Sequence, residues 1–108
     1  MRHSLALCLL AAAILAPRPA PAADVLPGDV GAGRELADRW CTACHVTEGL
    51  SKGTDAAPTF RFIANRKDRT AGEMEAWLVD PHPVMPDLKL SRTQIDDLIA
   101  YIESLKDE

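Results

Sequence analysis

Residues 41–45 read Cys-Thr-Ala-Cys-His, a C-x-x-C-H motif near the middle of a 108-residue chain. Two thiols three positions apart can each add to one vinyl group of the same porphyrin, and the imidazole that follows can bind its iron. This spacing anchors the ring twice, fixes its orientation and supplies a fifth iron ligand. The motif therefore predicts one covalently attached c-type haem, held by Cys41 and Cys44 and ligated by His45.

Other chemistries also use two cysteines at this spacing. A thioredoxin-like redox pair normally lies where a strand turns into a helix, whereas the segment before Cys41 has no β-branched run and reads as helix. A zinc site needs a second pair of ligands, and the remaining candidates are Cys8, His3 and His82. An inert or disulfide-forming pair beside a chance histidine is the third alternative.

The start of the chain has the pattern of a cleaved export signal. A short polar start precedes a twelve-residue apolar run, Leu5–Ala16, which is too short to span a bilayer as a helix. Cleavage is expected after Ala22, at an A-x-A pattern, with Ala23 as the neighbouring alternative. We therefore expect a signal peptide over residues 1–22, one domain over residues 23–108 and export to the periplasm. An uncleaved interfacial anchor is the alternative.

Charge and composition narrow the class of partner. Removal of Arg2 and Arg18 with the signal leaves residues 23–108 with a net charge of −6. This charge disfavours nucleic acid or an anionic membrane surface as the main partner, and it allows docking to a basic redox protein. The alternative is that the charge only keeps the domain soluble. A domain this small buries little apolar area alone, and a large flat apolar cofactor would complete its core.

Two capping boxes mark helix starts in the second half of the chain. Thr70 with Glu73, and Ser91 with Gln94, each place a hydroxyl three residues before a longer polar side chain, so that both can satisfy backbone N–H groups at a helix end. Pro81 ends the first of these helices. The second has an apolar face at helical spacing, formed by Ile95, Leu98, Ile99, Ile102 and Leu105.

Two more helices are expected around the motif. Asp29 is the predicted N-cap of a helix that runs through both motif cysteines. A short helix is predicted over Thr59–Ala64, with Phe60 and Ile63 facing inward. Residues 65–69 are charged and are predicted to form a solvated connection. No segment alternates with period two over a useful length, so the predicted fold class is all-α.

Three side chains could bind the iron opposite His45, namely Met74, His82 and Met85. Met74 lies on the apolar face of a predicted helix, where a methionine usually fills the core. Met85 lies in a loop with three prolines, which limit the freedom of the chain and help to hold a weak thioether–iron bond. His82 lies in the same loop and is an alternative ligand, since imidazole binds iron more tightly than a thioether does. An open sixth position is the last alternative. Ligation by Met85 predicts electron transfer, since a thioether favours ferrous iron and a six-coordinate iron has no open site.

Together these features resemble a small bacterial class I cytochrome c with one haem, over nearly all of residues 28–105. The matching features are Gly33 eight residues before the first cysteine, the C-x-x-C-H motif, Pro58 after the loop, the Met85-Pro86 pair, and DLIAYI at 97–102. The resemblance implies about four short helices wrapped around one covalently attached haem, with the N- and C-terminal helices crossing near Gly33. It implies thioether bonds from Cys41 and Cys44, and His45 and Met85 as axial iron ligands.

The resemblance also implies roles for residues that do not bind iron. The Pro58 carbonyl should accept a hydrogen bond from the second ring nitrogen of His45 and so fix the imidazole. Trp77 resembles the tryptophan that contacts a haem propionate in short bacterial members, with plain core packing as the alternative. Arg61 and Arg66 are candidate propionate partners, with surface charge as the alternative.

The function that follows is a periplasmic carrier of one electron. Its partners would be redox proteins, such as a membrane oxidoreductase and a terminal reductase, oxidase or dehydrogenase, with no nucleic acid and no permanent membrane span. Scattered carboxylates and the absence of a Ser/His pairing predict that the protein is not an enzyme. A subunit of a larger dehydrogenase or reductase complex is one alternative, and a haem-based sensor with a labile sixth ligand is another.

Overall fold

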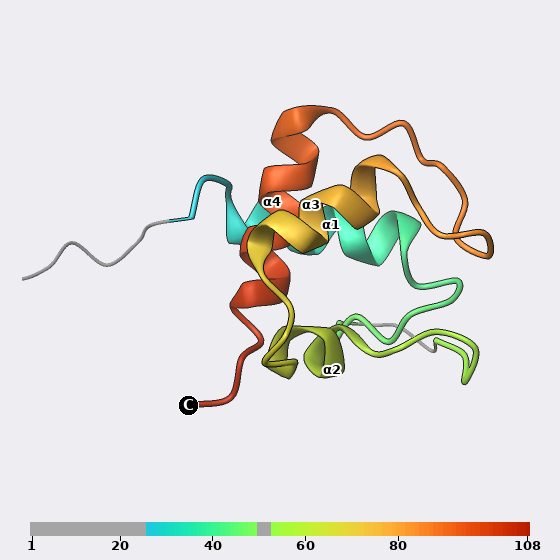
Figure 1. Ribbon diagram of the computed structural model, residues 1–108, viewed down its shortest axis with the longest axis horizontal. Helices are drawn as coiled ribbons and strands as arrows, with labels where there is room; N and C mark the ends of the chain where they lie inside the picture. Colours follow the sequence, from blue (N-terminus) through green and yellow to red (C-terminus); the bar gives the residue numbers. More distant parts are fainter. Residues whose placement is uncertain (1–25, 50–52) are drawn as a thin grey trace, which may run out of the picture.

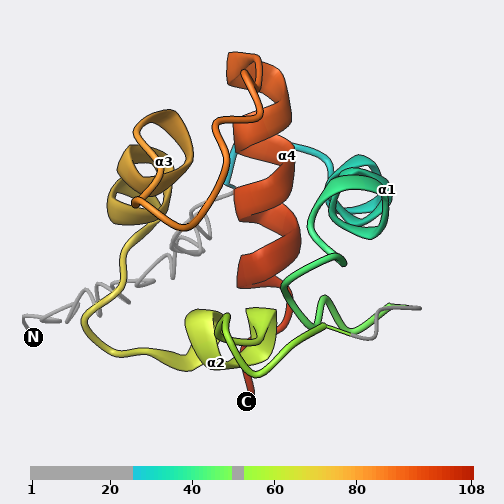
Figure 2. The same cartoon turned by 90° about the vertical axis from the view of Figure 1, so that its right-hand side faces the viewer.

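The computed structural model describes residues 26–49 and 53–108, and within these residues it contains four helices and no strand. The helices are α1 (Val30–Trp40), α2 (Phe60–Asn65), α3 (Ala71–Val79) and α4 (Arg92–Glu103). α4 lies at the centre, with α1 and α3 on either side and α2 near its C-terminal end (Figure 1, Figure 2). The prediction of an all-α fold with about four short helices is confirmed. The signal peptide predicted over residues 1–22 lies outside the described residues.

Polar side chains begin all four of these helices by accepting hydrogen bonds from backbone N–H groups, which would otherwise lack a partner. The N-caps are Asp29, Thr59, Thr70 and Ser91. Both predicted capping boxes are present, because the side chains of Glu73 and Gln94 accept from the N-cap backbone in return. The helix starts are therefore fixed by local sequence. In the described part of the chain, no helix is long and apolar enough to cross a membrane.

α1 is shorter than the sequence predicted, because it ends at Trp40 and leaves the motif cysteines outside. The Thr42 hydroxyl donates to the carbonyl of Asp38 at 3.2 Å, which is the carbonyl that the Thr42 N–H would bond if the helix continued. A hydroxyl that competes with the backbone in this way favours a turn over further helix. The motif therefore begins where the helix stops.

α1 and α4 cross with their backbones in contact at Gly33, as the resemblance implied. A Cβ added to Gly33 would lie 2.0 Å from the carbonyl oxygen of Asp97 and 2.8 Å from the Cβ of Tyr101. The contact extends to the start of α1, where the backbone N–H of Asp29 donates to the buried carboxylate of Asp97 at 2.7 Å. Only glycine allows the two helices to approach this closely.

The hydrophobic core joins α4 to the other three helices. Its buried members are Ala37, Cys41, Phe60, Ala64, Met74, Ile95, Leu98, Ile99, Tyr101 and Ile102. Each large apolar side chain buried in this way contributes roughly 1.5–3 kcal/mol. Leu105, predicted on the apolar face of the last helix, instead follows α4 and packs half-buried against the core.

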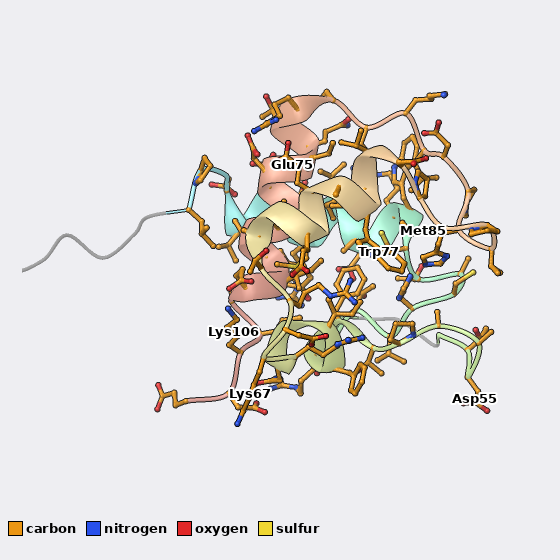
Figure 3. All side chains as sticks on the ribbon, viewed as in Figure 1. Asp55, Lys67, Glu75, Trp77, Met85 and Lys106 are labelled. Atoms are coloured by element: carbon orange, nitrogen blue, oxygen red, sulfur yellow. The ribbon has the colours of Figure 1, made fainter. Side chains whose placement is uncertain are left out.

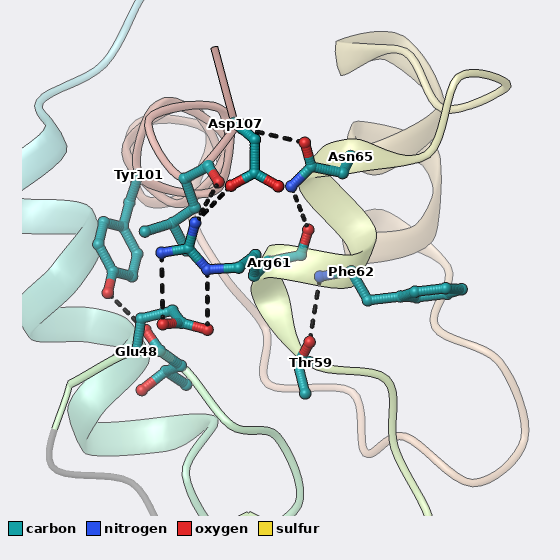
Figure 4. A network of polar contacts seen from close by, with 9 residues as sticks. Glu48, Thr59, Arg61, Phe62, Asn65, Tyr101 and Asp107 are labelled. Carbon is teal, nitrogen blue, oxygen red and sulfur yellow. Dashed lines mark hydrogen bonds and ion pairs between the residues drawn. The ribbon is translucent and has the colours of Figure 1, made fainter.

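A polar network ties the C-terminal segment to α2 and to the loop after the motif (Figure 4). The Arg61 guanidinium donates to Asp107 at 2.7 Å and pairs with Glu48 at 3.5 Å. The backbone N–H of Asp107 donates to the side chain of Asn65 at 3.0 Å. Each exposed ion pair contributes little alone, so the network chiefly fixes which segments lie together.

Candidate haem-binding site

The motif forms a single turn directly after α1. The N–H groups of Cys44 and His45 both donate to the carbonyl of Cys41, at 3.2 and 2.8 Å. Cys41 is buried and Cys44 is exposed, and both thiols are free. Burial, and to a lesser extent the charge of Asp38, raises the pKa of the Cys41 thiol from 9.0 to about 11. Cys41 therefore presents a neutral sulfur to an apolar wall, and a thioether there would bury no charge.

His45 is held in one orientation by the backbone of the segment before α2. Its Nδ1 lies 2.7 Å from the carbonyl oxygen of Pro58, which is the hydrogen bond that the resemblance implied. A carbonyl can only accept, so Nδ1 carries the proton, and the neutral imidazole then has its lone pair on Nε2. The ring is only 8% exposed and packs against Phe60, with centroids 5.4 Å apart. This leaves one defined nitrogen available as a metal ligand.

Two adjoining apolar cavities lie beside the motif turn. The larger has a volume of about 370 Å³ and the smaller about 130 Å³. Both are lined by Cys41, His45, Pro58, His82 and Met85. The larger cavity also reaches Phe60, Ile63, Met74, Trp77, Leu98 and Ile102, and the smaller one reaches Trp40, Cys44 and Val84. The proline-rich loop and the motif turn thus form walls of the same space.

This space fits a covalently attached haem. Both motif sulfurs, one imidazole of fixed tautomer and one thioether face or border it, and its volume and apolar lining suit a flat apolar ring. Cys41 and Cys44 could hold such a ring, and His45 and Met85 are candidates to bind its iron. Met74 and His82 line the larger cavity as well, so both alternatives to Met85 remain in reach of the space.

Two cationic side chains from residues 65–69 also border the larger cavity, and one of them is Arg66, a propionate candidate that the sequence indicated. Arg66 and Arg69 are half-buried and line the cavity, because the chain between α2 and α3 passes its edge. Arg69 lies over the indole of Trp77, 5.0 Å from the ring centroid. Arg61, the other candidate propionate partner, is instead in the network with Glu48 and Asp107.

Trp77 and Met85 come from different segments and line the same cavity, Trp77 from α3 and Met85 from the loop that follows it (Figure 3). The sequence indicated Trp77 and Met85 as candidate site residues, each on separate grounds. It did not indicate Arg69, whose contact with Trp77 depends on the angle at which the chain enters α3. An aromatic residue eight positions after an arginine carries no periodic signal for such a contact.

The alternative chemistries for the cysteine pair lack support in the described residues. No strand precedes the motif there, as a thioredoxin-like site would require. Within the same residues, no three His, Cys, Asp or Glu side chains gather into a metal-ion cluster of the kind that zinc needs.

Sequence comparison agrees with this geometry. The family model for cytochrome c matches residues 30–106, and the chain belongs to the cytochrome c family. It is therefore an electron-transfer haem protein, and its cofactor is covalently bound c-type haem. Among individual proteins, the chain is similar to cytochrome c-552 of Bradyrhizobium diazoefficiens, with 42% identity over 84 residues, which cover 77% of this chain and 81% of the relative. The predictions of family and cofactor are confirmed.

Proposed function

We propose that the protein is an exported carrier of single electrons, with a haem held by Cys41 and Cys44 and ligated by His45 and Met85. The observation that carries this proposal is the buried imidazole of His45. Its hydrogen bond to Pro58 leaves Nε2 as the ligating nitrogen, at the wall of two apolar cavities that Met85 also lines.

Each of these residues contributes to a stable one-electron centre. The haem iron supplies the one-electron couple when it is bound. The carbonyl of Pro58 fixes the orientation of His45 and increases its basicity as a ligand. The thioether of Met85 favours the ferrous state and raises the reduction potential relative to a second imidazole. The apolar walls of the two cavities lower the local polarity, which also favours the less charged ferrous state of the haem.

The edge of the larger cavity suits the carboxylate groups of a haem. Arg66 and Arg69 border it, and a guanidinium is well matched to a carboxylate in shape and charge. Trp77 borders it as well, and its indole N–H makes no hydrogen bond to another described residue. These three residues are our candidates for contact with the propionates.

The residues at the start of the sequence support export of the protein. Residues 1–22 have the order of a signal peptide, and residues 23–108 would form the mature domain. Bacterial cytochromes c are usually exported, which supports a periplasmic location. The partners would be redox proteins of that compartment, either free or in a complex that holds this domain as a subunit.

The ligand assignment is tested by Met85→Ala, produced together with haem-maturation machinery. We expect the variant to keep covalent haem but to lose the weak charge-transfer band at the red end of the visible spectrum that marks methionine ligation of ferric haem. Its reduction potential should fall by tens of millivolts or more. Met74→Leu removes the other methionine that lines the cavity and should keep the band. An unchanged band and potential in Met85→Ala would exclude Met85 as the ligand.

A further inference from the structure

The loop that carries Met85 is weakly tied to the rest of the protein by its backbone. It connects α3 to α4, and within it the N–H of Met85 donates to the carbonyl of His82 at 2.9 Å. Among the described residues, no hydrogen bond from residues 81–90 reaches outside this loop. A loop with so few bonds to its surroundings depends on side-chain packing for its position. Leu90 supplies such packing at the C-terminal end, where it lies half-buried against the core.

A ring contact supplies the packing at the other end. The rings of His82 and Trp77 lie edge to face, with centroids 4.8 Å apart and planes at 70°. This is a preferred geometry for aromatic pairs. The guanidinium of Arg69 lies over the same indole and adds a cation–π contact. Because the Met85 N–H is bonded to the His82 carbonyl, whatever fixes His82 also fixes the backbone of Met85.

The indole itself belongs to a rigid element. Trp77 lies in the last turn of α3, whose start is closed by the Thr70–Glu73 capping box and whose inner face buries Met74. The side chain of Trp77 is 43% exposed, so plain core packing does not explain its position. The indole of Trp77 therefore lies between the rigid helix α3 and the loop that carries Met85.

We propose that Trp77 is a positioning residue, which acts through His82 to hold the Met85 loop against the cavity. This inference rests on the proposed ligation by Met85. This role is separate from the propionate contact proposed above, because its effect on the displacement of Met85 would pass through the loop and would disappear when Met85 no longer binds the iron. An edge-to-face ring pair of this kind should change the equilibrium between a held and a released loop by about tenfold.

The test measures how easily an added ligand displaces the sixth ligand of the ferric protein. Imidazole is titrated into the haem-loaded wild type, and its apparent binding constant reports the fraction of molecules in which Met85 has left the iron. We expect Trp77→Leu and His82→Leu each to raise this constant by about tenfold, and the double variant to raise it no further than either alone. Trp77→Phe keeps a ring facing His82 and should restore most of the wild-type value. Val79→Ala, at an exposed position on the same helix, should match wild type.

A second background separates positioning from direct contact with the haem. In Met85→Ala the imidazole constant should be high, and adding Trp77→Leu should not change it, because no methionine remains to be held. An effect of Trp77→Leu that persists in this background would overturn the inference, as would a Trp77→Leu protein within twofold of wild type. Either of these two results would leave the assignment of Met85 as ligand intact. If Met85→Ala itself leaves imidazole binding unchanged, the ligand assignment fails and the inference fails with it.

Discussion

The crossing of α1 and α4 gives the sharpest stability prediction, which is that Gly33→Ala destabilises the protein. A Cβ at this position would lie 2.0 Å from the Asp97 carbonyl oxygen, and a backbone atom of a packed helix cannot move away alone. Overpacking of this kind costs up to about 3 kcal/mol. Replacing a helical glycine by alanine returns roughly 1 kcal/mol of helix propensity. We therefore expect a net loss of about 2 kcal/mol in the free energy of unfolding.

Gly72→Ala is the matched control, because it makes the same chemical change where there is room. The nearest atom to a Cβ on Gly72 is the Thr70 hydroxyl oxygen at 3.9 Å, so only the gain in helix propensity remains. This variant should be as stable as wild type or more stable, by up to about 1 kcal/mol.

The assay is urea unfolding of the haem-loaded proteins, followed by far-ultraviolet circular dichroism and by haem absorbance. In a domain of this size, a loss of about 2 kcal/mol corresponds to a fall in Tm of roughly 8–16 °C, which thermal unfolding can check. A Gly33→Ala protein as stable as Gly72→Ala would refute the inference that the two helix backbones are in contact at this position.

Three further predictions concern single contacts. Thr70→Ala removes the N-cap of α3 and should lower the free energy of unfolding by about 1 kcal/mol in urea, whereas Thr70→Ser should not. Asp97→Ala removes the acceptor for the Asp29 N–H and should cost roughly 1–3 kcal/mol, and Asp97→Asn, which keeps an acceptor oxygen, should cost less; equal losses would contradict this role. Burial, followed by the charge of Asp38, raises the pKa of Tyr101, so the folded protein keeps a proton that the unfolded chain loses near pH ~10. The free energy of unfolding should therefore fall as the pH rises above about 10, and Tyr101→Phe should reduce that slope.

The helix starts were predictable because their signals are local. Thr70 with Glu73, and Ser91 with Gln94, contain within four residues both halves of the hydrogen-bonding pattern that begins a helix. The end of α1 was not predictable in the same way. It depends on whether the Thr42 hydroxyl or the backbone N–H bonds the Asp38 carbonyl, and the sequence alone does not decide that competition.

The candidate site likewise has one part that was predictable from the sequence and one part that was not. The order of Cys41, Cys44 and His45 is a local pattern, and it indicates haem without any information on tertiary packing. The contact of Trp77 with His82 and Arg69 joins residues on three successive segments. It depends on the angles at which the chain enters and leaves α3, and such angles are set by tertiary packing and carry no periodic signal in the sequence.

The attachment of haem to residues 41–45 is the central claim, and the mass of the purified exported protein tests it most directly. We predict a polypeptide that begins at residue 23 and carries the added mass of one haem. Peptide mapping should place that mass on the fragment with Cys41 and Cys44. A colourless protein in which both cysteines are unmodified, after production with haem-maturation machinery, would contradict the account.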